Sequence, residues 1–227
     1  MILRLALFLL PVLALSACRD EHTWHQKLAV MVETPAGERA GAAVVEVRAI
    51  FGQQVMSQAE VQYGYTGEAT VVEVAPGKYL FALLGGTSER FACTVGTAMN
   101  WGSGPWSPGP DAKPRGEWLA EIPRMAGQPP VAVPQDCLPL MVTFGDINDP
   151  KTVQQVDPDD LAASFGPGVS LTSVTLAVTE EPVTEGKVEA VLGWLVEAGM
   201  TRFNVAKTPE GNIPLDAFLS IDHWSKQ

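Results

Sequence analysis

A segment dense in proline and glycine, residues 96–136, constrains most strongly how this chain can fold. Its prolines include positions 105, 108, 110 and 114, where a fixed φ and a missing N–H forbid a regular helix or a central strand. Patterns typical of regular secondary structure occur on both sides, in residues 27–95 and 137–227. The sequence leaves two arrangements open: two domains joined by a connector, or two halves that share one core.

The half before this segment, residues 27–95, has the pattern of short antiparallel strands. Leu28, Val30 and Val32 recur with a period of two, and turn residues separate the apolar runs. We expect strands at 27–33, 43–50, 68–74, 78–84 and 91–95. Since no helical periodicity interrupts them, the pattern predicts an antiparallel β-sandwich-like domain. The layout, with Thr-Pro-x-Gly and Pro-Gly-Lys-Tyr turns, resembles small β-sandwich modules of the transthyretin-like and carboxypeptidase-regulatory kinds.

The half after the segment, residues 137–227, alternates between strand and helix patterns. We expect strands at 138–144, 171–179 and 202–206, and helices at 157–165, 184–198 and 215–223. Asp157 is the predicted N-cap of the first helix and Thr184 that of the second. This order predicts a small α/β unit, and the whole chain is therefore assigned to the α+β class.

The N-terminus has the three parts of an export signal. Arg4 provides a positive charge, residues 5–15 are apolar, and small residues lead to Cys18 in the run Leu15-Ser16-Ala17-Cys18. Pro11 and the short apolar length argue against a transmembrane helix, which needs about 20 apolar residues.

This run resembles the lipobox of bacterial lipoproteins. The resemblance implies that residues 1–17 are removed as a signal peptide, that Cys18 is lipidated, and that residues 18–26 form a polar tether. It also implies a lipid-anchored, periplasm-facing protein of the cell envelope. Arg19 is not the usual residue for retention in the inner membrane, which favours the outer membrane.

The net charge limits the class of partner. The chain carries a formal charge of −11, and removal of Arg4 with the signal would make it −12. Nucleic-acid binding depends on Lys and Arg that neutralise phosphates, so the sequence argues against it. The acidic balance is explained either by solubility or by attraction to a basic partner.

Two cysteines remain once Cys18 is assigned to the lipid. In an oxidising periplasm, Cys93 and Cys137 are expected to form a disulfide. The alternative is a pair of buried free thiols. No histidine is near either cysteine in the sequence, which argues against a catalytic role.

The densest group of oxygen ligands is Asp146, Asn148 and Asp149, within the run Gly-Asp-Ile-Asn-Asp-Pro. Ca²⁺ takes six to eight oxygen ligands, and such side chains can supply them. The Asp-x-Asn-Asp portion resembles the calcium-binding linker of cadherins. The alternative is a turn in which aspartate accepts backbone N–H groups.

Three tryptophans in the proline-rich segment are candidate binding residues. Trp101, Trp106 and Trp118 are aromatic side chains that can stack on a glycan or a peptide. The alternative is that they are buried where the two halves meet.

The motifs of common enzymes are absent from the sequence. It has neither a Gly-x-Ser-x-Gly elbow nor a phosphate-binding glycine loop. Residues 146–184 resemble uncharacterised lipoproteins of marine alphaproteobacteria, and this resemblance implies no activity. The sequence therefore favours a non-enzymatic binding or scaffolding module without a cofactor. The alternative is a calcium-dependent or hydrolytic envelope enzyme with Asp146, Asp149 and Asp159 as ligands.

Overall fold

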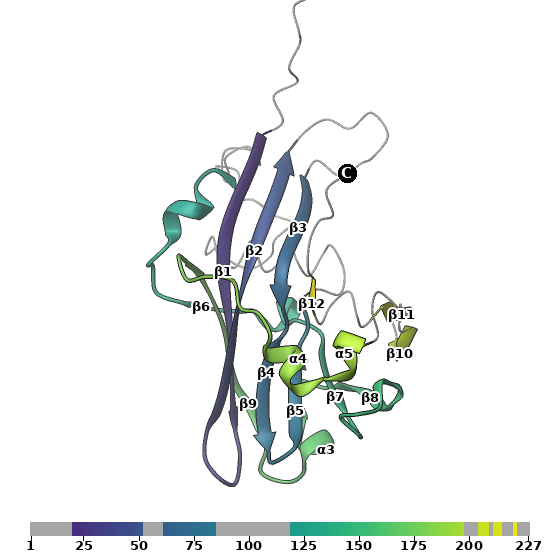
Figure 1. Cartoon of the computed structure of the whole chain (residues 1–227). Helices are drawn as coiled ribbons and strands as arrows, with labels where there is room; N and C mark the ends of the chain where they lie inside the picture. Colours follow the sequence, from purple (N-terminus) through teal and green to yellow (C-terminus); the bar gives the residue numbers. More distant parts are fainter. Residues whose placement is uncertain are drawn as a thin grey trace, which may run out of the picture.

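Two antiparallel sheets form the body of the protein in a computed structural model (Figure 1). The model describes residues 20–51, 61–84 and 119–197, and the backbone of the short segments 204–208, 211–214 and 220–221. The first sheet has the order β12-β3-β2-β1-β9-β6 and the second has the order β4-β5-β7-β8. A separate hairpin pairs β10 (Asn204–Thr208) with β11 (Gly211–Pro214).

The strands of the first sheet are β1 (Asp20–Glu33), β2 (Arg39–Phe51), β3 (Val61–Glu68), β6 (Val131–Ala132), β9 (Ser170–Thr179) and β12 (Ser220–Ile221). Those of the second are β4 (Thr70–Ala75), β5 (Lys78–Ala82), β7 (Met141–Phe144) and β8 (Val153–Val156). The described helices are short: η1 (Ile122–Met125), η2 (Gln135–Cys137), η3 (Pro150–Thr152), α3 (Leu161–Phe165), α4 (Lys187–Val191) and α5 (Trp194–Glu197). The α+β class with sandwich-like antiparallel sheets, predicted from the sequence, is confirmed.

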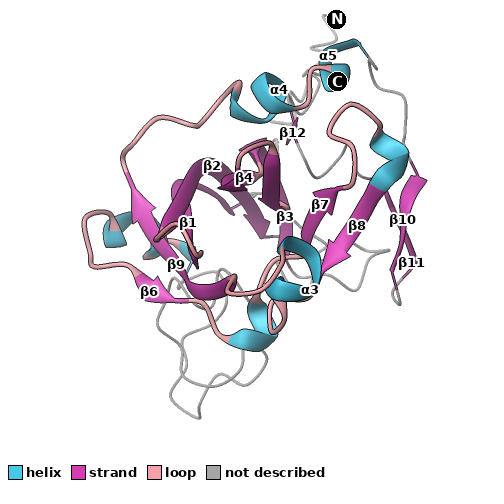
Figure 2. Cartoon of the chain, turned by 90° about the horizontal axis from the view of Figure 1, so that it is seen from below, coloured by secondary structure: helices cyan, strands magenta, loops and turns pink. Residues whose placement is uncertain are grey.

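Both sheets take strands from both halves of the chain. β1 lies between β2 and β9, and β5 lies between β4 and β7. Figure 2, viewed along the strands, shows β1, β9 and β6 on one side and β7 and β8 on the other. A common core joins them, with Val30, Leu80, Leu161 and Leu176 each at most 1 % exposed. The described parts of residues 27–95 and 137–227 therefore share one core.

The first strand begins earlier than predicted. Residues 18–26 were expected to be a polar tether, but β1 starts at Asp20 and pairs with β2 from there. Trp24 and Gln26 lie on its buried face, and the Trp24 indole N–H donates to Gln26 Oε1 over 3.3 Å. The tether prediction is wrong for these residues because two buried side chains occupy alternate positions in a segment that is otherwise polar.

The chain crosses from one sheet to the other after β3. The strand predicted at 68–74 is divided at Ala69, with Glu68 ending β3 and Thr70 beginning β4. Gly67 has a φ of 140°, and an added Cβ would lie 2.9 Å from Val45 Cγ1. A glycine is needed here because β2 packs directly against the turning backbone.

The prediction of a single helix at 184–198 is wrong. Two short helices, α4 and α5, occupy this segment, and Gly186 precedes α4 in a left-handed conformation. Thr184 does not cap a helix: its hydroxyl accepts from Val44 N over 2.8 Å, and its N–H donates to Val44 O over 2.9 Å. The β3 strand pairs with β2 only from Glu46, so Thr184 supplies the partners that the Val44 backbone would otherwise lack.

Two other predicted helices also differ from the structure. The helix expected at 157–165 begins at Leu161, and Asp160 caps it by accepting from Ala163 N over 3.1 Å. Asp157 instead closes a turn, accepting from Asp159 N over 2.9 Å. The segment expected as a helix at 215–223 contains strand β12, which pairs with the end of β3.

Candidate functional site

The acidic turn is closed by its own backbone donors. Asp146 Oδ1 accepts from Asn148 N over 2.9 Å, and Asp149 Oδ1 accepts from Lys151 N over 2.9 Å at the start of η3. The Thr152 hydroxyl donates to the carbonyls of Asp146 and Asp149. This is the geometry of an Asx turn followed by a capped 3₁₀ helix.

The structure does not bring the predicted metal ligands together as one set. Asp159 lies in a separate turn before α3, where its Oδ1 accepts from Gln135 Nε2 over 2.7 Å. No three His, Cys, Asp or Glu side chains are grouped for a metal ion within the described residues. Calcium binding by Asp146, Asn148 and Asp149 stays a prediction.

Most of the other residues predicted to be functional lie outside the part of the chain that the structure describes. Cys18, Cys93, Trp101, Trp106 and Trp118 lie outside the described residues. Cys137 is described: it is 4 % exposed and disulfide-bonded. Its pairing with Cys93 stays a prediction.

We expect peptide mapping of the unreduced protein to recover the peptides containing Cys93 and Cys137 as one linked species. The loop between these cysteines is long, so reduction should lower the free energy of unfolding by roughly 4 kcal/mol in the chain-entropy model. Thiol counting before and after reduction, combined with urea unfolding, measures both effects. Two free thiols in the unreduced, denatured protein would contradict the predicted pair.

Glu68 is a buried carboxylate at the corner between the sheets. It is 1 % exposed, and its two oxygens accept from Lys187 N over 3.1 Å and Val188 N over 3.0 Å. Burial raises the pKa of Glu68, and the two N–H bonds oppose this change. Both oxygens are occupied by the first turn of α4, so Glu68 is a structural anchor for that helix.

The α4–α5 segment covers the outer face of the second sheet. Val188 and Leu192 are fully buried there, in a cluster with Phe81 and Phe144. The rings of Phe81 and Phe144 meet edge to face with centroids 5.5 Å apart, and the Trp194 ring lies 5.9 Å from Phe144. This second cluster is packed as a core and contains no open site among the described residues.

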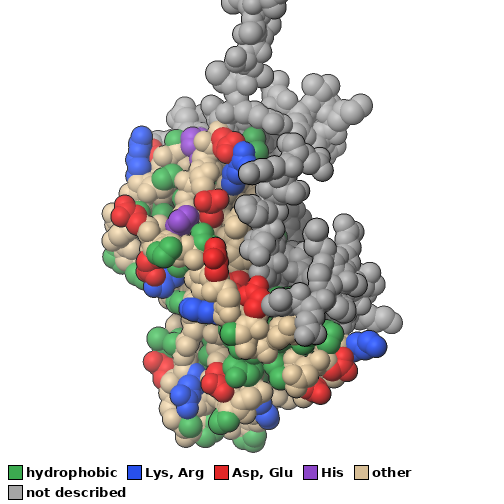
Figure 3. Space-filling model, in the orientation of Figure 1, with side chains coloured by type: hydrophobic (Ala, Val, Ile, Leu, Met, Phe, Trp, Pro, Cys, Tyr) green, Lys and Arg blue, Asp and Glu red, His purple; other side chains and the backbone are tan. Residues whose placement is uncertain are grey.

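The outer face of the first sheet carries paired charges. Lys27 Nζ contacts both carboxylate oxygens of Glu181 at 2.7 and 2.9 Å. Arg48 contacts both oxygens of Glu21 at 2.5 and 2.8 Å. Figure 3 shows acidic and basic side chains intermixed over the described surface on that side of the molecule. These groups neutralise one another, so this face offers no single-sign patch.

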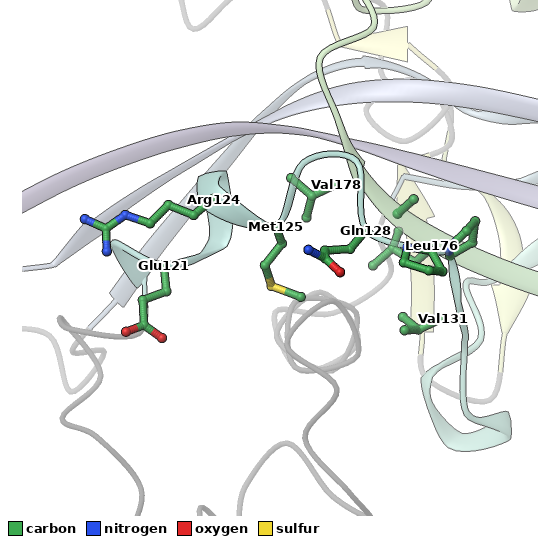
Figure 4. A pocket seen from close by; sticks show the side chains of 10 residues that line it. Glu121, Arg124, Met125, Gln128, Val131, Leu176 and Val178 are labelled. Atoms are coloured by element: carbon green, nitrogen blue, oxygen red, sulfur yellow. The ribbon is translucent and has the colours of Figure 1, made fainter.

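A surface pocket lies between β9 and the segment that precedes β6 (Figure 4). Its volume is about 690 Å³, and it is lined by Glu121, Arg124, Met125, Gln128, Pro129, Pro130, Val131 and Leu176–Val178. This volume is within the range of ligand pockets in proteins, about 300–1,000 Å³. Glu121 and Arg124 lie at one end of the pocket, and Val131 and Leu176 lie at the other.

The pocket wall is fixed at both of its ends. Ile122 begins η1 and is fully buried in the main core, while Val131 and Ala132 pair with Leu176 and Thr175 of β9. Residues 119–136 therefore belong to the folded body, which corrects the prediction of a connector over 96–136 for this portion. No pocket residue was predicted from the sequence; the signal available was Pro129-Pro130 placed directly before the short apolar run Val131-Ala132-Val133.

The fold defines the class of this protein as an α+β domain of two antiparallel sheets with one pocket described at a sheet edge. No family model, no curated protein and no solved structure matches this chain. No helix in the described residues is long and apolar enough to cross a membrane.

Proposed function

We propose that this chain is a lipid-anchored binding or scaffolding module of the cell envelope, facing the periplasm. One observation carries the proposal: a lipobox-like run ends at Cys18, and the fold begins at Asp20. The pocket beside β9 supports the binding role, since its volume of about 690 Å³ is within the range of ligand pockets. We place the protein at the outer membrane because Arg19, which follows the lipidated cysteine, is not the usual residue for retention in the inner membrane.

The short distance between the anchor and the fold has a geometric consequence under this proposal. Only Arg19 separates the acylated Cys18 from β1, so the N-terminal end of β1 would be held at the membrane surface. Val178, at the pocket, pairs with Gln26, six positions along β1 from Asp20. At about 3.3 Å per residue, the pocket then lies about 20 Å along the strand from the anchor. A ligand of this pocket would therefore have to come close to the membrane surface.

Lipidation at Cys18 is tested by growing cells that express the full chain with an alkyne-tagged fatty acid. We expect the label on the wild-type protein and on Cys137→Ser, and its loss from Cys18→Ala. Two or three acyl chains hold a protein stably on a membrane, so the wild type should sediment with membranes and a non-acylated form should not. A mature N-terminus other than Cys18, or label retained on Cys18→Ala, would overturn the proposal.

A further inference from the structure

We infer that the pocket beside β9 binds a single-chain zwitterionic phospholipid, with its charged headgroup at Glu121 and Arg124 and its acyl chain toward Val131. The inference rests on the proposed binding function and names a class of ligand for the same site. Three features of the described residues support it: the different polarity of the two ends of the pocket, the opposite charges at one end, and the position of the pocket near the proposed anchor.

The two ends of the pocket differ in polarity. Glu121 and Arg124 lie at one end, and Val131 lies at the other (Figure 4). Met125 and Gln128 lie between them. Ligand pockets combine apolar surface with a few polar groups that fix the orientation of the ligand. A ligand that fills both ends therefore has a charged group at one end and an apolar body at the other, as an amphiphile does.

The polar end of the pocket carries one charge of each sign. Arg124 is exposed, and no described residue forms an ion pair with it, whereas Lys27 and Arg48 each contact a carboxylate. The side chains of Glu121 and Arg124 point in different directions, so the pocket presents two separate charges (Figure 4). A ligand group of one sign would be repelled by one of them. A zwitterionic headgroup, which holds an anion and a cation a short distance apart, is complementary to both.

The apolar surface offered to the acyl chain is accessible. Met125 and Val131 are partly exposed, and Pro129-Pro130 is exposed. Leu176 is buried, so the other apolar residues provide the contact surface. Each methylene group of a chain that is removed from water there adds to the affinity. The flexible thioether of Met125 can adapt to the shape of the chain.

The size and position of the pocket favour a phospholipid over smaller zwitterions. Its volume of about 690 Å³ is larger than a free amino acid fills and is within the range for drug-sized ligands. Under the proposed function the pocket lies close to the membrane surface, which is a source of single-chain phospholipids. The ligand class thus agrees with both the pocket and its proposed location.

The experiment uses a lysophosphatidylethanolamine that carries a diazirine at the end of its acyl chain. The protein is studied as it is isolated from expressing cells, in nanodiscs if it is acylated and in buffer if it is not. After illumination, mass spectrometry locates the crosslinks, which we expect between Met125 and Val131. Unlabelled lysophosphatidylethanolamine should compete about fivefold better than anionic lysophosphatidylglycerol or a cationic alkyltrimethylammonium of equal chain length.

Two variants test the charges of the pocket separately. Arg124→Gln should lower crosslinking about fivefold or more and make the cationic amphiphile the best competitor. Glu121→Gln should let the anionic amphiphile compete as well as the zwitterion. Arg39→Gln, at an exposed arginine at the start of β2, is the matched control and should leave crosslinking and competition unchanged. Absence of crosslinks in the pocket, equal competition by all three amphiphiles, or an unchanged order of competition in Arg124→Gln would overturn the inference.

The two proposals fail in distinguishable ways. If the probe crosslinks in the pocket and Cys18 carries no lipid, the anchor is wrong and the phospholipid site stands. If Cys18 is acylated and the pocket is not crosslinked, the anchor stands and the phospholipid site is wrong.

Discussion

Replacing Gly41 with alanine is expected to lower the free energy of unfolding by about 3 kcal/mol or more, the upper end of the cost of overpacking a core. A Cβ at this position would lie 2.0 Å from Val71 O and 2.9 Å from Val71 C. Both are backbone atoms of β4, which is held in its own sheet by β5, so no side chain can move aside to relieve the contact. The two sheets would have to separate where β4 crosses β2.

Gly193→Ala is the matched control for Gly41→Ala. No atom lies within 4 Å of a Cβ built on Gly193, and the residue lies in the turn between α4 and α5. Its substitution should change the free energy of unfolding by at most about 0.5 kcal/mol. Urea unfolding followed by tryptophan fluorescence measures both variants. Equal midpoints for Gly41→Ala and the wild type would show that β2 and β4 are not in close contact.

Replacing Glu68 with alanine is expected to lower the free energy of unfolding by about 2–6 kcal/mol. The change leaves the N–H groups of Lys187 and Val188 without their acceptor in a buried environment, at about 1–3 kcal/mol each. Glu180→Ala, at an exposed glutamate after β9, is the control and should have little effect. We expect hydrogen exchange to show faster opening of α4 in Glu68→Ala, and unchanged exchange in α4 would contradict its anchoring role.

Glu68 should also give the stability a distinct dependence on pH. Burial raises the pKa of Glu68 in the folded protein, so the folded state holds this proton more tightly than the unfolded chain does. The stabilisation from this proton is fully present below the ordinary carboxyl pKa and is lost as the pH rises through the raised pKa.

Glu68→Gln removes the titrating group and keeps one acceptor oxygen. We expect the free energy of unfolding of the wild type, relative to Glu68→Gln, to fall as the pH rises from about 4, the ordinary range of a glutamate. Urea unfolding at a series of pH values measures this difference. Lys187 and Glu189, which also act on Glu68, are present in both proteins and cancel in the comparison. A difference that rises with pH would mean that the pKa is lowered instead.

Local patterns predicted local structure well in several places. The alternation at 171–179 matches β9, which spans Ser170–Thr179, and the Pro-Gly turn after β4 is present. These elements are specified by side chains within a few residues of one another. The helix predicted at 184–198 failed for the opposite reason, since Thr184 bonds to Val44, which is distant in the sequence.

The candidate site also contains local features that the sequence predicts and long-range features that it does not. Candidate residues were chosen for their chemistry, such as the carboxylates of Asp146 and Asp149, and the structure uses both in local turns. The pocket instead joins residues 121–131 to residues 176–178, and most of its side chains are ordinary apolar ones. No spacing within either segment indicates that the two meet.

The sequence by itself determined the class of the fold, the acidic balance, the turns and most strand patterns, because each depends on composition or on neighbours along the chain. Only the tertiary structure decided that β1 pairs with β9, that β5 pairs with β7, and that both halves share a core. Any apolar strand face can be buried against several others, so strand patterns do not name partners. The order of strands follows from how all the faces are buried together.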